Sequence, residues 1–549
     1  LSQMPLTIEV PYVYQCELSG IGQTESHDVV WYGKTFRLPD CFDARTHLIF
    51  GAVDWHCDLF VNGRYAGSHD GGYTPFRTDI TPFLRADGEQ ELILRVEDTL
   101  RCDQLRGKQS WEKEPSRCWY TPSTGIWQSV WLERVPDNPI QSIHITPNLP
   151  QSEIRCEISL NKPPKKDGQF KIDVQYQGHS IAALTYKTKQ MNVDLSVPIQ
   201  PEDYIDEIHY WTPEHPNLYD VTVSYASDGQ TDQVFTYFGF RDVCTRDGKT
   251  LLNHRPIYQR LILHQGYYDG GLLTADTDER YRTDLQAIKD MGFNGVRMHQ
   301  KIEDPLFYYW ADKIGLLVWG ELPSCYEFSE LAMRRSFESM REFIQRDYNH
   351  PSIVCWVPLN ESWGVRNIEH NAAQQRYAVS LYHFIKAMDS TRWVSTNDGW
   401  EQVTTDFCTL HDYSFDGKAL SSRWDDLDAL LQSAAQDRMI FASGYQYTGQ
   451  PILLTEFGGV AFKTNQSKKD WGYCAIEKNE ASYIRRLTSL FSYIKTNRRI
   501  QGYCYTQFTD VMQETNGLLS IRREPKIAID AIRSILFGTD DSEPFSPVP

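Results

Sequence analysis

The sequence contains no apolar run long enough to cross a membrane and no excess of positive charge. No stretch of about 18 apolar residues occurs, so we expect no transmembrane helix. Lys and Arg number 55 against 73 Asp and Glu, which gives a formal net charge of −18 at pH 7. Nucleic-acid and anionic-membrane partners both require a basic patch, so neither is expected.

Cysteine pairs with the spacing of a metal site or a redox motif are also missing. The twelve cysteines are scattered, and Cys355, Cys408 and Cys504 lie inside apolar runs. We expect buried free thiols, which suit a reducing cytosol. The opening residues, LSQMPLTIEV, lack the basic and apolar segments of a secretory signal. A cytoplasmic location follows as the expectation, and a removed signal peptide stays open.

Helical periodicity is absent before about residue 270, and the chain of 549 residues is too long for one hydrophobic core. Residues 1–138 alternate apolar and polar side chains between Gly, Pro and Asp, with a hairpin signal at Asn62-Gly63. Residues 139–241 contain short, regularly spaced strands over about 100 residues, which is typical of an immunoglobulin-like sandwich. Two N-terminal all-β domains are therefore predicted.

From about residue 250 onward, short apolar strands alternate with longer helical segments. Eight β/α units over 242–540 predict a (β/α)8 TIM barrel, and the polar, Pro-rich tail 541–549 is expected to be frayed. The eight candidate strands are YQRLILHQG, FNGVRMHQ, LLVWGELP, IVCWVPLNES, RWVSTNDGW, DFCTLHDY, PILLTEFGG and IQGYCYTQFTD.

Two glutamates end strongly apolar strands of the predicted barrel. Glu361 follows IVCWVPLN in the fourth strand, and Glu456 follows PILLT in the seventh. The carboxyl ends of barrel strands face the active site. Glycoside hydrolysis needs such a carboxyl pair, set about 5–5.5 Å apart when one of them is the nucleophile. The acid must then lie where burial or the other carboxylate raises its pKa.

Several segments resemble glycoside hydrolase family two, the family of β-galactosidases, β-glucuronidases and β-mannosidases. HPSIVCWVPLNESWG resembles its acid/base motif and ILLTEFGG its nucleophile motif. HDGGYTPFRTDIT and STGIWQSVWLE resemble its N-terminal sugar-binding domain. The resemblance covers nearly the whole chain. It implies a jelly-roll sandwich, an immunoglobulin-like sandwich and a barrel, with retention of anomeric configuration and no organic cofactor.

Carried over by motif, the resemblance assigns roles at the strand ends. Glu361 is the expected acid/base and Glu456 the expected nucleophile. Asn360 is expected to bind the sugar 2-hydroxyl, Tyr413 to position the nucleophile, and Arg297 to hold the carboxylates.

The resemblance also implies residues that line the pocket. His299 follows the second strand, and Trp363 and Trp400 lie at strand ends where they would stack on sugar faces. Trp119 and Tyr120 belong to a sandwich-domain loop that reaches the barrel mouth in the family. The alternative is that each of these four aromatic rings packs within the protein and does not contact the sugar.

Three departures from the family pattern concern the substrate. Met298-His299-Gln300-Lys301 replaces a Ser/Asn-His-Tyr-Pro-type stretch, and the first strand ends without an Arg-Gly-x-x-x-His pattern. On the eighth strand, Gln507 lies in the segment where the family often has a tryptophan platform. These three departures leave the identity of the sugar open.

Galactosidases of the family often bind Mg and Na ions, but no ligand set is assigned here.

We therefore expect a retaining exo-β-glycosidase that removes terminal β-linked sugars and is most similar to β-galactosidases. A β-glucuronidase or another β-glycosidase of the family is the alternative within enzymes. A catalytically dead carbohydrate-binding protein is the alternative of another class. The expected partner is a carbohydrate, and a homo-oligomer is left open.

A uronic acid needs a cation for its carboxylate, and the Asn-x-Lys motif that provides it in family β-glucuronidases is absent from the sequence. This absence predicts a preference for a neutral sugar, because an unpaired buried carboxylate is costly. Arg522-Arg523 is the alternative source of a cation.

Overall fold

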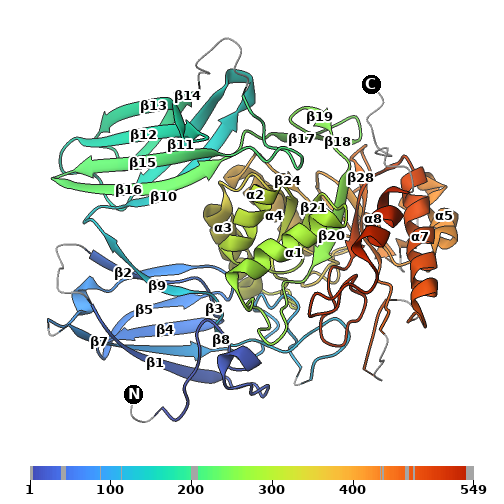
Figure 1. Ribbon diagram of the computed structural model, residues 1–549, viewed down its shortest axis with the longest axis horizontal. Helices are drawn as coiled ribbons and strands as arrows, with labels where there is room; N and C mark the ends of the chain where they lie inside the picture. The colour runs from blue at the N-terminus through green and yellow to red at the C-terminus, as the bar shows by residue number, and fades with distance from the viewer. Residues whose placement is uncertain are drawn as a thin grey trace.

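The computed structural model describes residues 4–38, 45–86, 88–112, 114–199, 208–432, 434–435, 438–463, 469–473 and 476–538. Two β-sandwiches lie on one side of the molecule and a barrel of strands and helices on the other (Figure 1). This arrangement confirms the predicted fold class. The predicted tail, 541–549, lies outside the described residues.

The first sandwich consists of a four-stranded and a three-stranded antiparallel sheet, with a short extra pair. Asn62 and Gly63 both have positive φ, 54° and 76°, as the two-residue turn between β4 and β5 requires. The predicted hairpin is thus confirmed. In sheet order the strands are β1 (Val29–Arg37), β7 (Glu89–Glu97), β4 (His56–Val61) and β5 (Arg64–Asp70); β6 (Phe76–Asp79), β2 (Arg45–Phe50) and β9 (Val130–Val135); and the pair β3 (Val53–Asp54) and β8 (Gly125–Ile126).

The second sandwich pairs a three-stranded sheet with a four-stranded one around its own core. Alternate residues point inward, as in β14, where Val193, Leu195 and Val197 are buried and their neighbours exposed. In sheet order its strands are β10 (Ile140–Asn148), β11 (Glu153–Leu160) and β14 (Asn192–Pro198), facing β13 (His179–Thr188), β12 (Gly168–Tyr176), β15 (Tyr219–Ser227) and β16 (Gln230–Phe238). A small sheet of β17 (Val243–Arg246), β18 (Lys249–Leu252) and β19 (Arg255–Pro256) leads into the barrel.

Eight parallel strands form the barrel, and each lies within one of the eight predicted segments. The edge strands β24 and β25 are not paired along their length. The Asp406 backbone N–H instead bonds to the Val394 carbonyl at 3.0 Å and links the two edges. In chain order the strands are β20 (Gln259–His264), β21 (Gly295–Met298), β22 (Leu317–Glu321), β23 (Ile353–Val357), β24 (Trp393–Val394), β25 (Cys408–Asp412), β28 (Ile452–Gly458) and β29 (Ile500–Thr506).

Helices surround the barrel, and the first α-helix of the described chain begins at Asp278, after the region that lacked helical periodicity. None of the helices in the described residues is long and apolar enough to cross a membrane. The helices are α1 (Asp278–Asp290), α2 (Pro305–Ile314), α3 (Glu330–Asp347), α4 (Ala372–Met388), α5 (Gly417–Trp424), α6 (Leu427–Gln432), α7 (Glu480–Thr496) and α8 (Ile529–Phe537), with 3-10 turns η1 (Glu17–Ser19), η2 (Thr81–Phe83) and η3 (Leu149–Gln151) and a hairpin of β26 (Ala434–Ala435) and β27 (Arg438–Met439).

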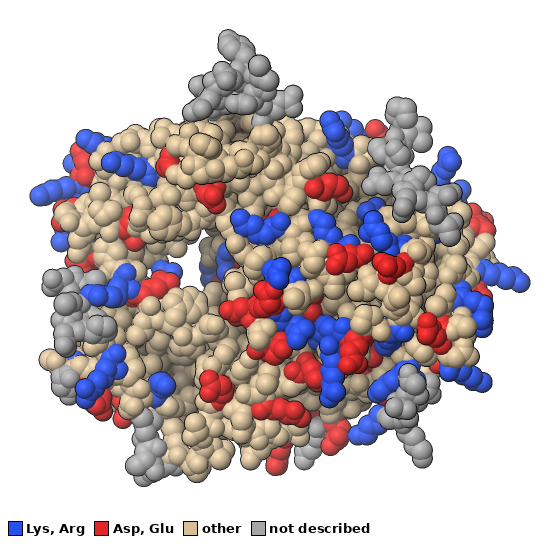
Figure 2. Space-filling view, in the orientation of Figure 1, with Lys and Arg blue, Asp and Glu red and all other residues tan. Residues whose placement is uncertain are grey.

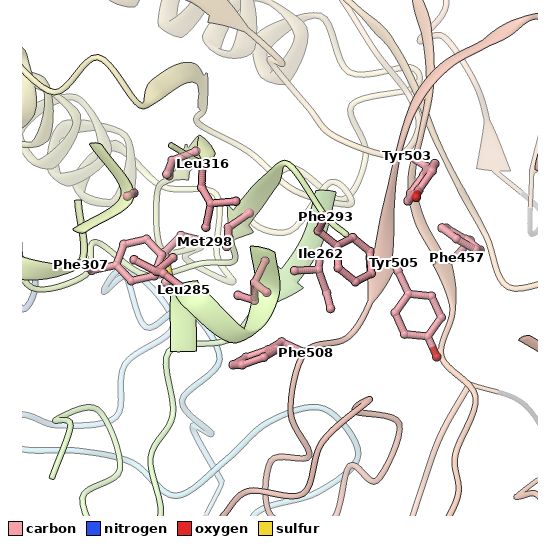
Figure 3. Packing of buried hydrophobic residues seen from close by; sticks show 14 of the residues in the cluster. Ile262, Leu285, Phe293, Met298, Phe307, Leu316, Phe457, Tyr503, Tyr505 and Phe508 are labelled. Atoms are coloured by element: carbon pink, nitrogen blue, oxygen red, sulfur yellow. The ribbon is translucent and has the colours of Figure 1, made fainter. Parts of the chain in front are cut away.

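The barrel core separates apolar packing from a polar interior. In β21, Val296 and Met298 belong to the core between strands and helices, whereas Arg297 between them faces the interior. Figure 3 shows this outer core, including Phe457 and Tyr505, whose ring centroids lie 5.5 Å apart. The alternation of side chains along the strand therefore decides which of them reach the site.

On the face drawn in Figure 2, acidic and basic side chains are interspersed.

Candidate active site

Arg297 organises the carboxyl end of the barrel from the middle of β21. Its side chain is fully buried. The guanidinium lies 2.8 Å from Glu321 through Nε, 2.6 Å from Asp398 through Nη1 and 3.0 Å from Glu456 through the same nitrogen. Nη2 donates to Asn360 Oδ1 at 2.7 Å. Four strand ends are thereby joined to one cation.

The charge of Arg297 is secured by this carboxylate ring. Burial lowers its pKa, but the surrounding carboxylates outweigh burial and hold the pKa well above the ordinary value. A planar guanidinium can bond several acceptors in fixed directions, which suits a buried position of this kind. The strands of the barrel are therefore held in register by charged hydrogen bonds as well as by the sheet.

His411 on β25 lies between the two glutamates. Its Nδ1 is 2.8 Å from Glu361 Oε1 and 3.6 Å from Glu456 Oε2, and its Nε2 is 3.3 Å from Asp398 Oδ2. Burial lowers the pKa of His411, but these carboxylates outweigh burial and raise it to about 10. The imidazole is therefore a cation at neutral pH, and it donates to Glu361.

Glu361 has an unusual backbone conformation. Glu361 and Ser362 both have positive φ, 49° and 56°, in the left-handed region that non-glycine residues rarely adopt. Hydrogen bonds hold the turn, from Glu361 N–H to the Asp398 carbonyl at 2.9 Å and from Ser362 N–H to Asn397 Oδ1 at 3.0 Å. Such conformations cost about 1–3 kcal/mol each and cluster at functional sites.

The pKa of Glu361 does not follow the expectation for the acid. Burial raises this pKa, but the hydrogen bond from His411 and the positive charges of His411 and Lys108 outweigh burial, so the pKa lies below the ordinary value. The prediction that burial or the other carboxylate raises the pKa of the acid is therefore wrong for Glu361. The reason is the hydrogen bond from His411, a contact that the sequence did not indicate.

Glu456 lies near the end of β28 and receives a second hydrogen bond besides that from Arg297. The Tyr413 hydroxyl donates to Glu456 Oε2 at 2.5 Å, and the Tyr413 ring stacks on Tyr473 with centroids 3.7 Å apart. One oxygen of each of Glu361 and Glu456 and one His411 nitrogen lie within 4.8 Å of one another. The carboxyl groups are thus close enough for both to act on one glycosidic bond.

Aromatic side chains from two domains meet beside Glu361. Trp119 of the first sandwich contacts Trp363 edge to face at 5.2 Å, and its Nε1 donates to the Tyr326 hydroxyl at 2.9 Å. Arg366 lies over the other ring of this pair, Trp363, at 4.0 Å. The loop of the first sandwich therefore reaches the barrel mouth, and Trp363 is partly covered by protein.

Tyr120 and Lys108 of the same loop are buried at the mouth. The Tyr120 hydroxyl donates to Glu514 Oε2 at 2.5 Å, and the Tyr120 N–H donates to the Lys108 carbonyl at 2.8 Å. Burial lowers the pKa of Lys108, but Cys118 and the nearby glutamates raise it above the ordinary value. Lys108 thus places a positive charge near Glu361 and Glu456.

Three further predicted residues line the site. His299 Nδ1 lies 3.1 Å from the Glu321 carboxylate, and burial together with Arg297 holds the His299 pKa well below its ordinary value. Trp400 contacts His411 edge to face at 5.5 Å. Gln507 donates to Asn516 Oδ1 at 2.6 Å. Trp400 Nε1 and Gln507 Oε1 are buried and have no hydrogen-bond partner within the described part of the chain.

Sequence reasoning missed five charged or titratable residues of the site. Four of them come from the barrel at or beyond the strand ends, and the rule that located Glu361 applies to them equally. Lys108 comes from another domain, and its spacing carries no comparable signal. The five are Glu321, Asp398, His411, Glu514 and Lys108.

Two groups of side chains in the described residues have the spacing of metal ligands. One is Glu361, His411 and Glu456, where the protonated His411 offers no lone pair to an ion at neutral pH. The other is Asp242, Cys244 and His254 beside the small sheet.

A barrel with two facing carboxyl groups at its strand ends has the site of a glycoside hydrolase. Comparison with known families agrees. Residues 243–534 match the TIM barrel domain of glycosyl hydrolases family 2, residues 138–241 match the family domain that precedes it, and residues 3–136 match its sugar binding domain. The chain belongs to glycoside hydrolase family 2, a family of retaining enzymes.

The relatives are distant and differ in name. A protein from Formosa agariphila described as a β-glucuronidase is 28% identical over 349 residues, 62% of this chain and 40% of that protein. A β-galactosidase from Thermoanaerobacter pseudethanolicus is 29% identical over 346 residues, 61% of this chain and 45% of that protein. The chain thus spans less than half the length of these two relatives.

Solved structures share the fold over almost the whole chain. A β-D-glucuronidase from Dictyoglomus thermophilum has a TM-score of 0.79 at 19% identity, covering 97% of this chain and 94% of that chain. A β-galacturonidase from Eisenbergiella tayi bound to galacturonate has a TM-score of 0.76 at 22% identity, covering 96% and 92%. At such identity the likeness is one of fold.

Proposed function

We propose that the protein is a retaining exo-β-glycosidase that cleaves terminal β-linked sugars by double displacement. The observation that carries the proposal is the convergence of Glu361 and Glu456 on His411 within 4.8 Å. Carboxyl groups about 5–5.5 Å apart act by retention, whereas inverting enzymes separate theirs by about 6.5–9.5 Å to admit a water.

In the first step, an oxygen of Glu456 bonds to the anomeric carbon while the bond from that carbon to the leaving oxygen breaks. Arg297 and the Tyr413 hydroxyl hold the attacking carboxylate. The leaving oxygen takes a proton from Glu361, which shares a hydrogen-bonded proton with His411. His411 is protonated at neutral pH, so the pair carries a proton even though Glu361 alone has a lowered pKa.

In the second step, Glu361 takes a proton from water and the water oxygen bonds to the anomeric carbon. The bond to Glu456 breaks, and its carboxylate returns to Arg297 and Tyr413. Two inversions give net retention. The reaction needs no organic cofactor, and a dead carbohydrate-binding protein would have no use for two carboxyls set at this separation.

The sugar has two candidates. The absence of an Asn-x-Lys motif favours a neutral, β-galactoside-like sugar. Lys108 favours a β-uronide, because it places a cation in the pocket from a different domain. The structural observation has more weight, since a missing motif excludes only one source of positive charge.

Hydrolysis of nitrophenyl β-glycosides, followed by proton NMR of the released sugar, tests the proposal. Galactoside, glucoside, mannoside, glucuronide and galacturonide provide the panel. We expect the β-anomer to form first and then mutarotate. Initial release of the α-anomer would exclude the double displacement, and turnover of none of the panel by a folded protein would favour the carbohydrate-binding alternative.

A further inference from the structure

Lys108 is a buried cation with no ion-pair partner at the barrel mouth. Its side chain is mostly enclosed, with 6% of the residue exposed. Among the described residues no carboxylate lies within salt-bridge distance of its Nζ; the contact that acts on it most strongly is the Cys118 thiol. A thiol is a weak acceptor, so the three donors of the ammonium group are largely unused.

The backbone around Lys108 fixes its position against the barrel. The Arg106 and Gly107 N–H groups both donate to the Ser324 carbonyl at 3.0 Å. Gly107 has φ +58°, and a Cβ there would meet the Gln300 carbonyl oxygen at 2.3 Å. Only glycine allows the loop to lie this close to the ends of β21 and β22, and the next residue is Lys108.

The backbone places Lys108 beside the carboxyl end of the barrel, because its carbonyl accepts from the N–H of Tyr120, whose hydroxyl donates to Glu514. The pKa of Lys108, raised in part by Glu514, Glu456 and Glu361, agrees with this position. Glu514 already accepts from the Tyr120 hydroxyl at 2.5 Å and from Asn516 Nδ2 at 3.1 Å. Hydrogen-bond donors other than Lys108 therefore satisfy this carboxylate, and the ammonium group remains available to a ligand.

A ligand carboxylate buried in this pocket would be costly without a cation, and the ammonium group of Lys108, whose donors meet no carboxylate within salt-bridge distance among the described residues, can supply that cation. A neutral sugar has only hydroxyls to offer, whereas a uronic acid has a carboxylate at C6. We infer that Lys108 binds the carboxylate of a hexuronic acid and makes the enzyme selective for β-uronides. This inference rests on the proposed glycosidase function and names its substrate class.

Arg522 and Arg523, the cations suggested by the sequence, are bound elsewhere. Arg523 lies 2.9 Å from the buried Asp284 and donates to the Tyr267 carbonyl at 3.1 Å. Arg522 is 72% exposed and lies 3.2 Å from Asp269. The alternative cations that the sequence suggested are therefore engaged with Asp284 and Asp269, and the inference takes its cation from the first sandwich.

The test compares kcat/KM for paired nitrophenyl substrates, β-galacturonide with β-galactoside and β-glucuronide with β-glucoside. The wild type should favour the uronide in at least one pair. In Lys108→Met, the ratio of uronide to neutral kcat/KM should fall by about 100-fold or more, as expected when one member of a buried charge pair is removed. Lys108→Arg, which keeps the charge, should recover part of the ratio, and Arg522→Ala is the matched control that should keep it.

A binding measurement separates this inference from the proposed function. Calorimetry with free glucuronate, galacturonate, glucose and galactose requires no turnover, and it is made on the wild type, Lys108→Met and Glu456→Gln. Uronate binding that is lost in Lys108→Met but kept in Glu456→Gln supports the inference even if hydrolysis fails. An equal loss for uronic and neutral sugars in folded Lys108→Met and Lys108→Arg proteins, or a wild type that prefers the neutral sugar in both pairs, would overturn it.

Discussion

Replacing Tyr413 by phenylalanine should slow the second half of the reaction more than the first. The change removes the hydroxyl that donates to Glu456 Oε2 at 2.5 Å, while stacking on Tyr473 at 3.7 Å holds the ring in place. When the glycosyl-enzyme breaks down, Glu456 leaves as a carboxylate, and a donor to that oxygen stabilises the developing charge. In the first step the same charge is consumed, so the hydroxyl assists less.

The magnitude follows from the kind of hydrogen bond. A bond to a charged group contributes about 1.5–3 kcal/mol, and each 1.36 kcal/mol in the barrier is tenfold in rate. We therefore expect kcat in Tyr413→Phe to fall by about 10- to 150-fold, and KM to fall with it because the covalent intermediate accumulates.

Stopped-flow release of dinitrophenol from an activated glycoside measures this directly. The variant should show a burst of about one equivalent per active site, followed by a slow steady state. Tyr473→Phe is the matched control, since it removes a hydroxyl from the stacked partner without removing the donor to Glu456, and it should show no burst. Unchanged kcat, or a fall in kcat/KM as large as that in kcat and without a burst, would refute the assigned role.

Three further outcomes follow from the site. In His411→Asn, the alkaline limb of the kcat/KM profile should move to lower pH, because the pair loses the member whose raised pKa keeps a proton at the site as pH rises; an unmoved limb would place the proton elsewhere. Glu361→Ala should lose about 10²–10⁴-fold on alkyl glycosides and much less on dinitrophenyl glycosides, and equal losses would mean that Glu361 is not the acid. Arg297→Gln should lower the free energy of unfolding by about 3–5 kcal/mol, since it leaves buried carboxylates without their cation; a denaturation midpoint equal to that of the wild type would contradict this.

The fold was predictable because each element has its own periodic signal. The eight barrel strands are short apolar runs between helical segments, and each predicted segment contains one observed strand. The turn at Asn62-Gly63 followed from its backbone requirement. Such features depend on neighbours in the chain, which the sequence displays directly.

The candidate site was predictable only in part. Glu361, Glu456 and Arg297 lie in or just after barrel strands in recognisable motifs, and the structure brings them together. The lowered pKa of Glu361 depends on His411, fifty residues away, through a contact that exists only in the closed barrel. The position of Lys108 depends on how one domain packs on another. Contacts between residues far apart in the chain leave no pattern in the local sequence.

Covalent trapping of the nucleophile tests the central claim most directly. The protein is incubated with 2-deoxy-2-fluoro-β-glucuronyl and 2-deoxy-2-fluoro-β-galactosyl fluorides. The fluoride at C1 is the leaving group, and the fluorine at C2 slows breakdown of the glycosyl-enzyme. The protein is then digested and its peptides are mapped by mass spectrometry. The account predicts one glycosyl group per chain, bound to Glu456 in the peptide containing ILLTEFGG, and no label in Glu456→Gln. A label on Glu361 or on another residue, with Glu456 unmodified, would contradict it.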